Sequence, residues 1–165
     1  MEIRFAERSD YKNIAAIHIE SWKDSYSGVL PAEFLEKKIQ WEFERHWNEI
    51  KIQDKDIILV AEDISLVGFA AVWCRPIPFI DNLHVRPSQR TKGIGLSLMK
   101  TVANRLLDEG HRKAYLWVFE RNEKAIRFYE RLGGIQKEQS MKNIFGYNVL
   151  SRKIEWNDLS AILRK

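Results

Sequence analysis

Residues 85–99 read VRPSQRTKGIGLSLM: the end of an apolar strand, a basic loop, two glycines one residue apart, and the start of a helical apolar pattern. Gly93 and Gly95 stand where the helix begins, although glycine disfavours helix by roughly 1 kcal/mol relative to alanine. The first N–H groups of a helix have no partner within it, and the helix dipole adds partial positive charge there. Glycine lets an anion approach these donors because it has no Cβ, so the stretch predicts a phosphate site. A simple turn or close helix packing remains the alternative.

The composition is that of a globular protein. The chain has 165 residues, 45% apolar and 30% charged, without repeats or a Pro/Gly/Ser linker, so we expect a single domain over residues 1–165. No stretch approaches the roughly 20 apolar residues of a membrane span. The start, MEIRFAERSDY, lacks the apolar core of a secretion signal. We therefore expect a cytoplasmic protein with no membrane partner.

Metal, disulfide and nucleic-acid chemistry find little support. Cys74 is the only cysteine, which excludes an internal disulfide, and after the apolar run at 67–73 it is expected to be a small buried side chain. The four histidines lack the spacing of zinc ligands, and we predict no metal. The formal net charge of +4 fits an anionic partner. Its lysines and arginines are spread along the chain instead of clustered with aromatic residues, so we expect no nucleic-acid partner.

Hydrophobic patterns predict strands and helices in a defined order. Strands are expected at residues 2–6, 57–61, 66–73, 79–85 and 114–119, the last buried on both faces, followed by a closing hairpin over 134–156. Helices are expected after Ser9 or Asp10, in one or two segments over 32–50, from Gly95 to a stop at Gly110, and through Ala125–Leu132 to Gly133 and Gly134. This order predicts an α/β (α+β) fold on a mixed sheet of about six to seven strands flanked by helices.

Two motifs make the phosphate loop more specific. The loop lacks the Gly-Lys-Ser/Thr of a Walker motif and the third glycine of a Rossmann motif. The run Arg90-Thr91-Lys92-Gly93-Ile94-Gly95, which follows the strand NLHV, resembles the R/Q-x-x-G-x-G/A signature of the GNAT superfamily of N-acetyltransferases. Residues 122–134 (NEKAIRFYERLGG) resemble the family's N-x-x-A-x-x-F-Y-x-x-x-G-F element, with a Gly-Gly pair where Gly-Phe is common. The resemblance extends from Ile3 to about Trp156.

The resemblance implies a strongly twisted sheet in which the parallel strands 79–85 and 114–119 splay apart, with acetyl-CoA in the opening. It implies cofactor contacts from the backbone of Leu83, His84 and Val85, from the amides of Arg90, Thr91, Lys92, Gly93, Ile94 and Gly95, and from the Ser97 hydroxyl. Lys124 and Arg131 would meet the terminal phosphate, or would belong to a solvated helix face. Asn122 would bond cofactor amides, or would act as a plain helix cap.

Acetyl transfer to an amine needs a neutral nucleophile, a polarised thioester carbonyl and a proton for the leaving thiolate. By the resemblance Tyr129 supplies that proton, because a phenol with a pKa near 10 stays protonated at neutral pH; the alternative is a core aromatic residue. Asp81 is the first choice for the general base, expected on the same strand face as Leu83, or else it pairs with a basic side chain. Glu20 and His84 are alternative bases, and some related enzymes use an ordered water.

The acceptor site is expected between the first two helices and the closing hairpin. The run Ser-Trp-x-x-x-Tyr-x-Gly at residues 21–28 resembles a segment of many small GNAT enzymes, which act on antibiotics, polyamines, amino acids and peptide N-termini. Trp22, Tyr26, Trp41 and Trp47 either wall an amine pocket or pack the helices. The leading interpretation is an acetyl-CoA-dependent N-acetyltransferase acting on a primary amine. The alternative is a non-catalytic CoA-binding sensor, and the resemblance leaves a homodimer open.

Overall fold

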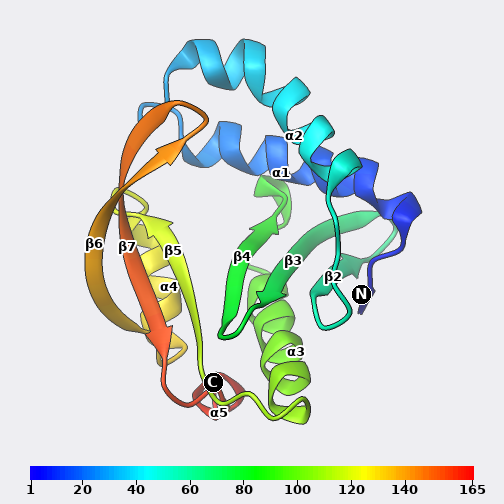
Figure 1. The fold of residues 1–165 in the computed structure, drawn as a ribbon. Coiled ribbons are helices and arrows are strands. Elements are labelled where there is room, and N and C mark those ends of the chain that lie inside the picture. Colours follow the sequence, from blue (N-terminus) through cyan, green and yellow to red (C-terminus); the bar gives the residue numbers. More distant parts are fainter.

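A computed structural model describes residues 1–165, and its elements follow the order that the sequence predicts (Figure 1). The strands are β1 (Glu2–Phe5), β2 (Ile57–Glu62), β3 (Leu66–Cys74), β4 (Pro78–Val85), β5 (Ala114–Phe119), β6 (Ile135–Ile144) and β7 (Tyr147–Trp156). The helices are α1 (Tyr11–Ser25), a π-helical turn (Phe34–Lys38) running into α2 (Ile39–Glu49), α3 (Ile94–Asp108), α4 (Glu123–Arg131) and α5 (Ser160–Leu163). None of these helices has both the length and the apolar composition required to cross a membrane.

The strands form one mixed sheet in the order β1-β2-β3-β4-β5-β7-β6. Adjacent strands are antiparallel except β4 and β5, which run parallel. These two pair only at Phe79 and Tyr115, near the start of both strands, and then diverge (Figure 1). The predicted mixed sheet with splayed parallel strands is confirmed. Beyond this single pair, the facing edges of β4 and β5 have no strand partner.

Helices pack on both faces of the sheet. Alternate residues of β2 separate the two cores: Leu59 packs with α3, α4 and α5, whereas Val60 packs with α1 and α2. A third apolar cluster joins α1 and α2 to the ends of β5 and β7, through residues such as Phe43 and Phe119. Burial of apolar surface on both faces holds the divergent halves of the sheet together.

Strand β5 differs from the prediction of burial on both faces. Tyr115 and Trp117 are only half-buried, because this strand borders the opening beside β4. Lys153 and Lys142 lie over these two rings, with Nζ to ring-centroid distances of 5.0 and 3.8 Å. One side of β5 is therefore core and the other side is part of a cleft.

The turn after α4 explains why two glycines follow one another there. Gly133 has a φ of +86°, a left-handed conformation that favours glycine. A Cβ on Gly134 would lie 2.6 Å from Ile154 Cγ2 and 2.9 Å from Trp156 Cζ2. The Trp156 ring thus takes the space beside Gly134, and its Nε1 donates to the Leu132 carbonyl at 3.0 Å. Packing within this chain requires the departure from Gly-Phe.

Two features lie outside the sequence expectations. Helix α5 is a single turn, too short to show a helical period, and it forms because Leu159 and Ile162 are buried against the main core. Cys74 is a free thiol at the end of β3 and only half-buried, so the expectation of a buried side chain was too strong. Partial burial raises the pKa of this thiol and leaves it protonated at neutral pH.

Candidate active site

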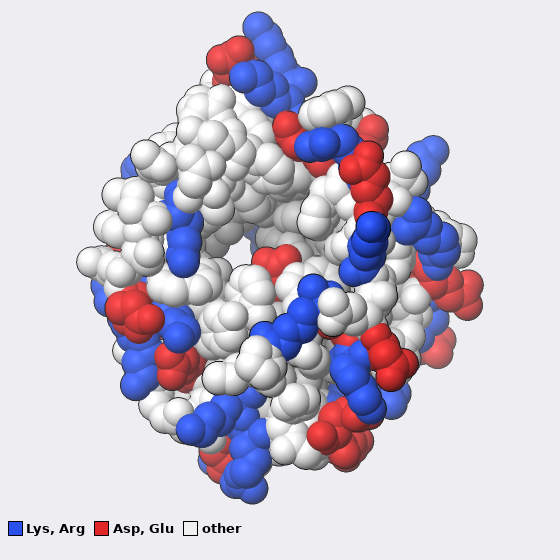
Figure 2. Space-filling view, viewed as in Figure 1, with Lys and Arg blue, Asp and Glu red and all other residues white.

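The divergence of β4 and β5 opens a cavity of about 1040 Å³, which α1, α4, the start of α3 and the β6–β7 turn enclose. Figure 2 shows the molecule hollowed at this position. Asp81 is the only carboxylate among the lining residues, and the lining cations are Arg90, Lys124, Arg131 and Lys142. The volume suits a large ligand together with a smaller one.

The backbone from Thr91 to Leu96 forms an anion cradle at the start of α3. None of these consecutive N–H groups donates to a protein acceptor, and the first helical bond runs from the Ser97 N–H to the Gly93 carbonyl at 2.9 Å. Thr91 and Gly93 have φ values of 66° and 78°, so two residues of this loop have a left-handed φ. Successive N–H groups in such a loop form an anion-binding concavity, and strain at a residue like Thr91 is typical of functional loops.

The two glycines of this loop have different structural reasons. Gly93 is required by its left-handed φ, and a Cβ there would meet nothing within 4 Å. Gly95 has a helical conformation, and a Cβ there would lie 3.6 Å from Phe128 Cζ, an ordinary contact. Gly93 therefore serves the turn, whereas packing does not require Gly95. The lack of a side chain at Gly95 leaves the free amides accessible to a bulky anion.

The side chains of the loop contribute less than its backbone. The Arg90 guanidinium donates to the Asp24 carboxylate and, at 3.2 Å, to the Ser21 hydroxyl, which ties it to α1. Lys92 is exposed and bonded to Gln89 Oε1 at 2.9 Å. Neither Lys92 nor Ser97 lines the cavity. The predicted Lys92 contact is through its backbone N–H, which is one of the free donors of the cradle, and the predicted contact of the Ser97 hydroxyl stays a prediction. Thr91, Gly93, Ile94 and Gly95 line the cavity.

Strand β4 presents its free edge to the cavity. Leu83, His84 and Val85 pair with β3 through their other edge. Leu83 and Val85 pack against the main core, whereas the His84 ring turns to α1. The backbone of these three residues is therefore open on one side, where the resemblance implies that an extended ligand adds as a strand.

A β-bulge changes the position of Asp81. Ala71 pairs with Asn82 and Val72 with Ile80, so Asp81 is the extra residue of β4. Its Oδ2 accepts hydrogen bonds from Trp73 Nε1 at 2.8 Å and Asn82 Nδ2 at 3.2 Å. Trp73 packs on the α1 and α2 side of the sheet, so the expectation that Asp81 shares a face with Leu83 was wrong. Although Asp81 is exposed by area, desolvation within the cleft raises the pKa of its carboxyl.

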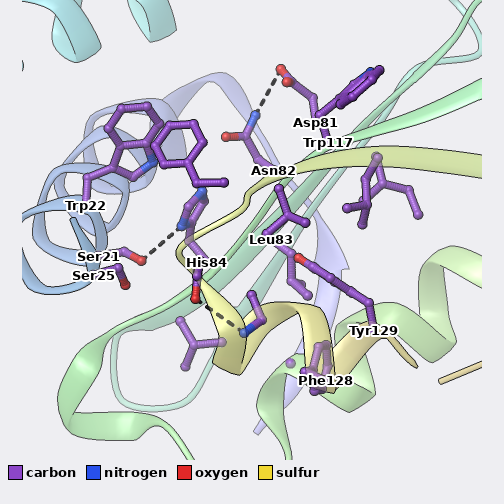
Figure 3. A pocket seen from close by; sticks show the side chains of 18 of the residues that line it. Ser21, Trp22, Ser25, Asp81, Asn82, Leu83, His84, Trp117, Phe128 and Tyr129 are labelled. Carbon is purple, nitrogen blue, oxygen red and sulfur yellow. Dashed lines mark hydrogen bonds between the residues drawn. The ribbon is translucent and has the colours of Figure 1, made fainter. Parts of the chain in front are cut away.

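The two alternative bases, Glu20 and His84, are less suitable than Asp81 in position or in basicity. Glu20 lies outside the cavity and pairs with the Arg86 guanidinium, so the structure does not bring it to the site. His84 lines the cavity, with its Nδ1 2.9 Å from the Ser21 hydroxyl (Figure 3). Burial, and then the charge of Arg90, lower the pKa of His84 to about 3. A neutral imidazole with that pKa is a weak proton acceptor.

Tyr129 faces the cavity from α4. Figure 3 shows its hydroxyl directed towards Leu83 of β4. Burial, and then the neighbouring phenol of Tyr26, raise the pKa of Tyr129. Asn122 caps α4, because its Oδ1 accepts from the Ala125 N–H at 3.3 Å, and its Nδ2 donates to the Tyr26 hydroxyl at 3.3 Å. Asn122 therefore acts as a cap that links α4 to α1.

The far end of the cavity lies between α1, α2 and the β6–β7 turn. Of the four aromatic residues singled out in the sequence, Trp22 and Tyr26 line the cavity. Trp47 is core, and Trp41 is exposed with Arg45 over its ring. The structure adds lining residues that no local pattern marks: His18, Phe43, His46, Lys142 and Phe145. Only their tertiary positions bring them together.

His18 has a defined tautomer. Its Nδ1 accepts from Trp47 Nε1 at 3.0 Å, and an indole N–H can only donate, so the His18 proton lies on Nε2. That Nε2 is buried and has no hydrogen-bond partner. Burial and the neighbouring histidines hold the pKa of His18 well below its usual range, so the ring is neutral.

Comparisons with known proteins agree with this geometry. The model of the acetyltransferase (GNAT) family matches residues 15–134. YuaI of Bacillus subtilis, an uncharacterized N-acetyltransferase, is 27% identical over 170 residues, or 97% of this chain and 95% of that protein. A spermidine N(1)-acetyltransferase of Thermoplasma acidophilum is 26% identical over 145 residues, or 81% of this chain and 87% of that protein.

Solved structures show the same fold. The PaiA N-acetyltransferase of Thermoplasma acidophilum, in complex with coenzyme A, has a TM-score of 0.71 at 20% identity, over 92% of this chain and 96% of that chain. The splayed strands, the free amides at the start of α3 and a family match over most of the chain support one conclusion. The chain belongs to the GNAT family of N-acetyltransferases, whose co-substrate is acetyl-CoA.

Proposed function

We propose that this protein transfers the acetyl group of acetyl-CoA to a primary amine of a small molecule or peptide, by direct attack within a ternary complex. The observation that carries the proposal is that Tyr129 and Asp81 face one cavity, from α4 and β4, next to the free amides of Thr91–Leu96. When bound, acetyl-CoA supplies the acetyl thioester. A CoA sensor would use the free amides but has no need of the two proton-bearing side chains.

The residues around the cavity fit such a ligand. The free amides at the start of α3 suit a diphosphate, because the helix dipole and consecutive N–H donors both favour negative charge. Lys124 and Arg131 line the cavity beside them and add positive charge for a further phosphate. The open edge of β4 offers backbone donors and acceptors to an amide-containing arm.

Tyr129 is the proposed general acid. Its raised pKa keeps the hydroxyl protonated throughout the physiological range, so Tyr129 can donate to a developing thiolate but cannot act as a base there. The hydroxyl points to the open β4 backbone, where the extended ligand arm is expected. The Tyr129 proton leaves on the CoA thiol, the amine nitrogen loses its second proton to solvent as the amide forms, and a proton from solvent restores the Tyr129 phenol after turnover.

Asp81 is the proposed group that receives the amine. Both protein donors bind its Oδ2, which leaves Oδ1 for the ammonium group of the acceptor. Desolvation raises the carboxyl pKa, so Asp81 is a stronger base than an ordinary aspartate. The ammonium must lose a proton before it attacks, and Asp81 Oδ1 accepts that proton.

The test is Tyr129→Phe, with Tyr11→Phe as the matched control, since Tyr11 lies outside the cavity. We expect Tyr129→Phe to lower kcat about 10²–10⁴-fold, because it removes the acid and keeps the ring. The Kd of acetyl-CoA should stay within about twofold, since the phenol acts only in the transition state. Free CoA release with a panel of amines and calorimetric titration measure the two quantities. Normal turnover of the variant would remove Tyr129 from the mechanism.

A further inference from the structure

The turn between β6 and β7 contains an unusual residue. Phe145 and Gly146 form a two-residue connection, with φ values of 49° and 89°. Turns of this kind are normally Asn-Gly or Gly-Gly, because a bulky side chain in the left-handed region is strained. The Phe145 side chain is also 43% exposed. Both its backbone conformation and its exposed apolar surface are unfavourable for the free protein, and a role for the ring in binding would account for both.

The Phe145 ring lies at the acceptor end of the cavity. It stacks on Phe34 with a centroid distance of 5.2 Å and an interplanar angle of 24°. Its centroid is 5.5 Å from that of Phe43 and 6.3 Å from that of Trp22. Trp22, Phe43 and Phe145 all line the cavity, and together they form an aromatic wall. An apolar ligand group placed here would cover part of the exposed Phe145 ring.

Charge at this end favours an acceptor with one ammonium group. Asp81 is the only carboxylate lining the cavity, and the lowered pKa values of His18 and His46 make both rings neutral at pH 7. Lys142 lines the same end of the cavity, and its ammonium group lies over the Trp117 ring. A second ammonium group in the cavity would find no carboxylate and would be repelled by Lys142.

A small pocket of about 230 Å³ adjoins the cavity at His46 and Phe145. It contains Glu42 and Glu49, so an ammonium group that extended past Phe145 would meet carboxylates there. Arg45 lines this pocket too and pairs with Glu42 at 3.3 Å, which leaves Glu49 as its one uncompensated carboxylate. The main cavity therefore offers an aromatic surface and one acid, whereas the outer pocket offers a weak cation site.

We propose that the aromatic wall makes this protein selective for arylalkylamines, primary amines joined to an aromatic ring by a short aliphatic linker. The ammonium group of the acceptor lies at Asp81 Oδ1, and its aromatic ring lies against Phe145. Phe145 is therefore the residue that determines which amine is accepted. This assignment of substrate class rests on the proposed acetyl transfer.

The first test compares 2-phenylethylamine with spermidine as acceptors for the wild-type protein. We expect kcat/KM to be up to about tenfold higher for 2-phenylethylamine, since one favourable aromatic contact corresponds to a difference of about two- to tenfold. The substitution Phe145→Asn should lower kcat/KM for 2-phenylethylamine about tenfold and change that for spermidine less than about twofold. Asparagine suits the left-handed turn, so Tm should shift by no more than about 3 °C.

The matched control is Ile64→Asn in the β2–β3 turn, where the side chain is fully exposed and far from the cavity lining. This substitution should leave kcat/KM unchanged for both 2-phenylethylamine and spermidine. A preference for spermidine, or an equal loss with both amines in Phe145→Asn, would overturn the substrate class and leave acetyl transfer standing. If no amine is acetylated although calorimetry shows acetyl-CoA binding, the proposed transfer fails and the substrate class fails with it. The wild-type comparison decides the question even if the variant does not fold.

Discussion

The two ends of the cavity are built from different kinds of group. The proposed donor end consists of backbone amides from one continuous segment, Thr91–Leu96, and of the free edge of β4. The proposed acceptor end consists of side chains from α1, α2, β4 and the β6–β7 turn, such as Trp22, Asp81 and Phe145. Backbone groups keep their positions when side chains change, whereas a side-chain wall changes with each substitution. The acceptor specificity of this fold can therefore vary without loss of the donor site.

The sharpest test of this division is Asp81→Asn at the acceptor end. We expect kcat/KM for the amine to fall about 10²–10⁴-fold, because the variant lacks the only carboxylate in the cavity and the proposed base. The Kd of acetyl-CoA, measured by calorimetry, should not change. A parallel loss of acetyl-CoA affinity would show that the two ends are not separate.

The same variant carries a stability prediction with a defined sign. Desolvation raises the pKa of Asp81 in the folded protein, so ionisation of the carboxyl lowers the stability as the pH rises above the unfolded pKa, and the loss is complete above the folded pKa. Asparagine is neutral at every pH and still accepts the Trp73 hydrogen bond. Asp81→Asn should therefore have a higher Tm than the wild type at pH 7, and this advantage should shrink as the pH falls towards about 4. An advantage that grows on acidification would contradict the raised pKa.

The second test changes only the donor end. A Trp at Gly95 would place a ring over the free amides without backbone strain, because Gly95 is already helical. We expect Gly95→Trp to weaken acetyl-CoA binding about 100-fold, the loss of about two charge-assisted hydrogen bonds. Phe145→Asn, at the other end, should leave this Kd unchanged. Normal binding by Gly95→Trp would mean that the phosphates lie elsewhere.

The smallest expected effect distinguishes the role of Gly93 in the turn before α3 from its role in binding acetyl-CoA. Gly93 and Gly110 begin and follow the same helix, have φ values of 78° and 87°, and have open space where a Cβ would lie, with nothing within 4 Å. Gly93→Ala and Gly110→Ala should each lower the free energy of unfolding by about 1 kcal/mol, through the same left-handed strain. Only Gly93→Ala should also raise the Kd of acetyl-CoA, by a few-fold, because it relaxes the loop that aims the amides. Thermal unfolding and calorimetric titration measure the two quantities, and an unchanged Kd in Gly93→Ala would assign Gly93 to the turn alone.

The sequence by itself determined the elements and marked the loop that we propose as the donor site. Helix α3 begins at the predicted glycines, α4 begins after Asn122, and the strands follow the apolar runs. These features depend on interactions between residues close in the chain: a left-handed glycine, a cap three residues from its donor, a period of two or 3.6. The short helix α5 escaped prediction because it depends on burial of Leu159 and Ile162 by distant partners.

Only the tertiary structure decided the acceptor end. Because of the bulge, Asp81 lies on the opposite face of the sheet from the predicted one. Glu20 pairs with Arg86 outside the site, and burial lowers the pKa of His84 and makes it a weak base. Phe145 reached the cavity because β6 and β7 bring their turn to α1 and α2. Each of these outcomes depends on contacts between residues far apart in the chain. A local sequence pattern determines neither the distance between such residues nor how deeply they are buried, and burial shifts the pKa values.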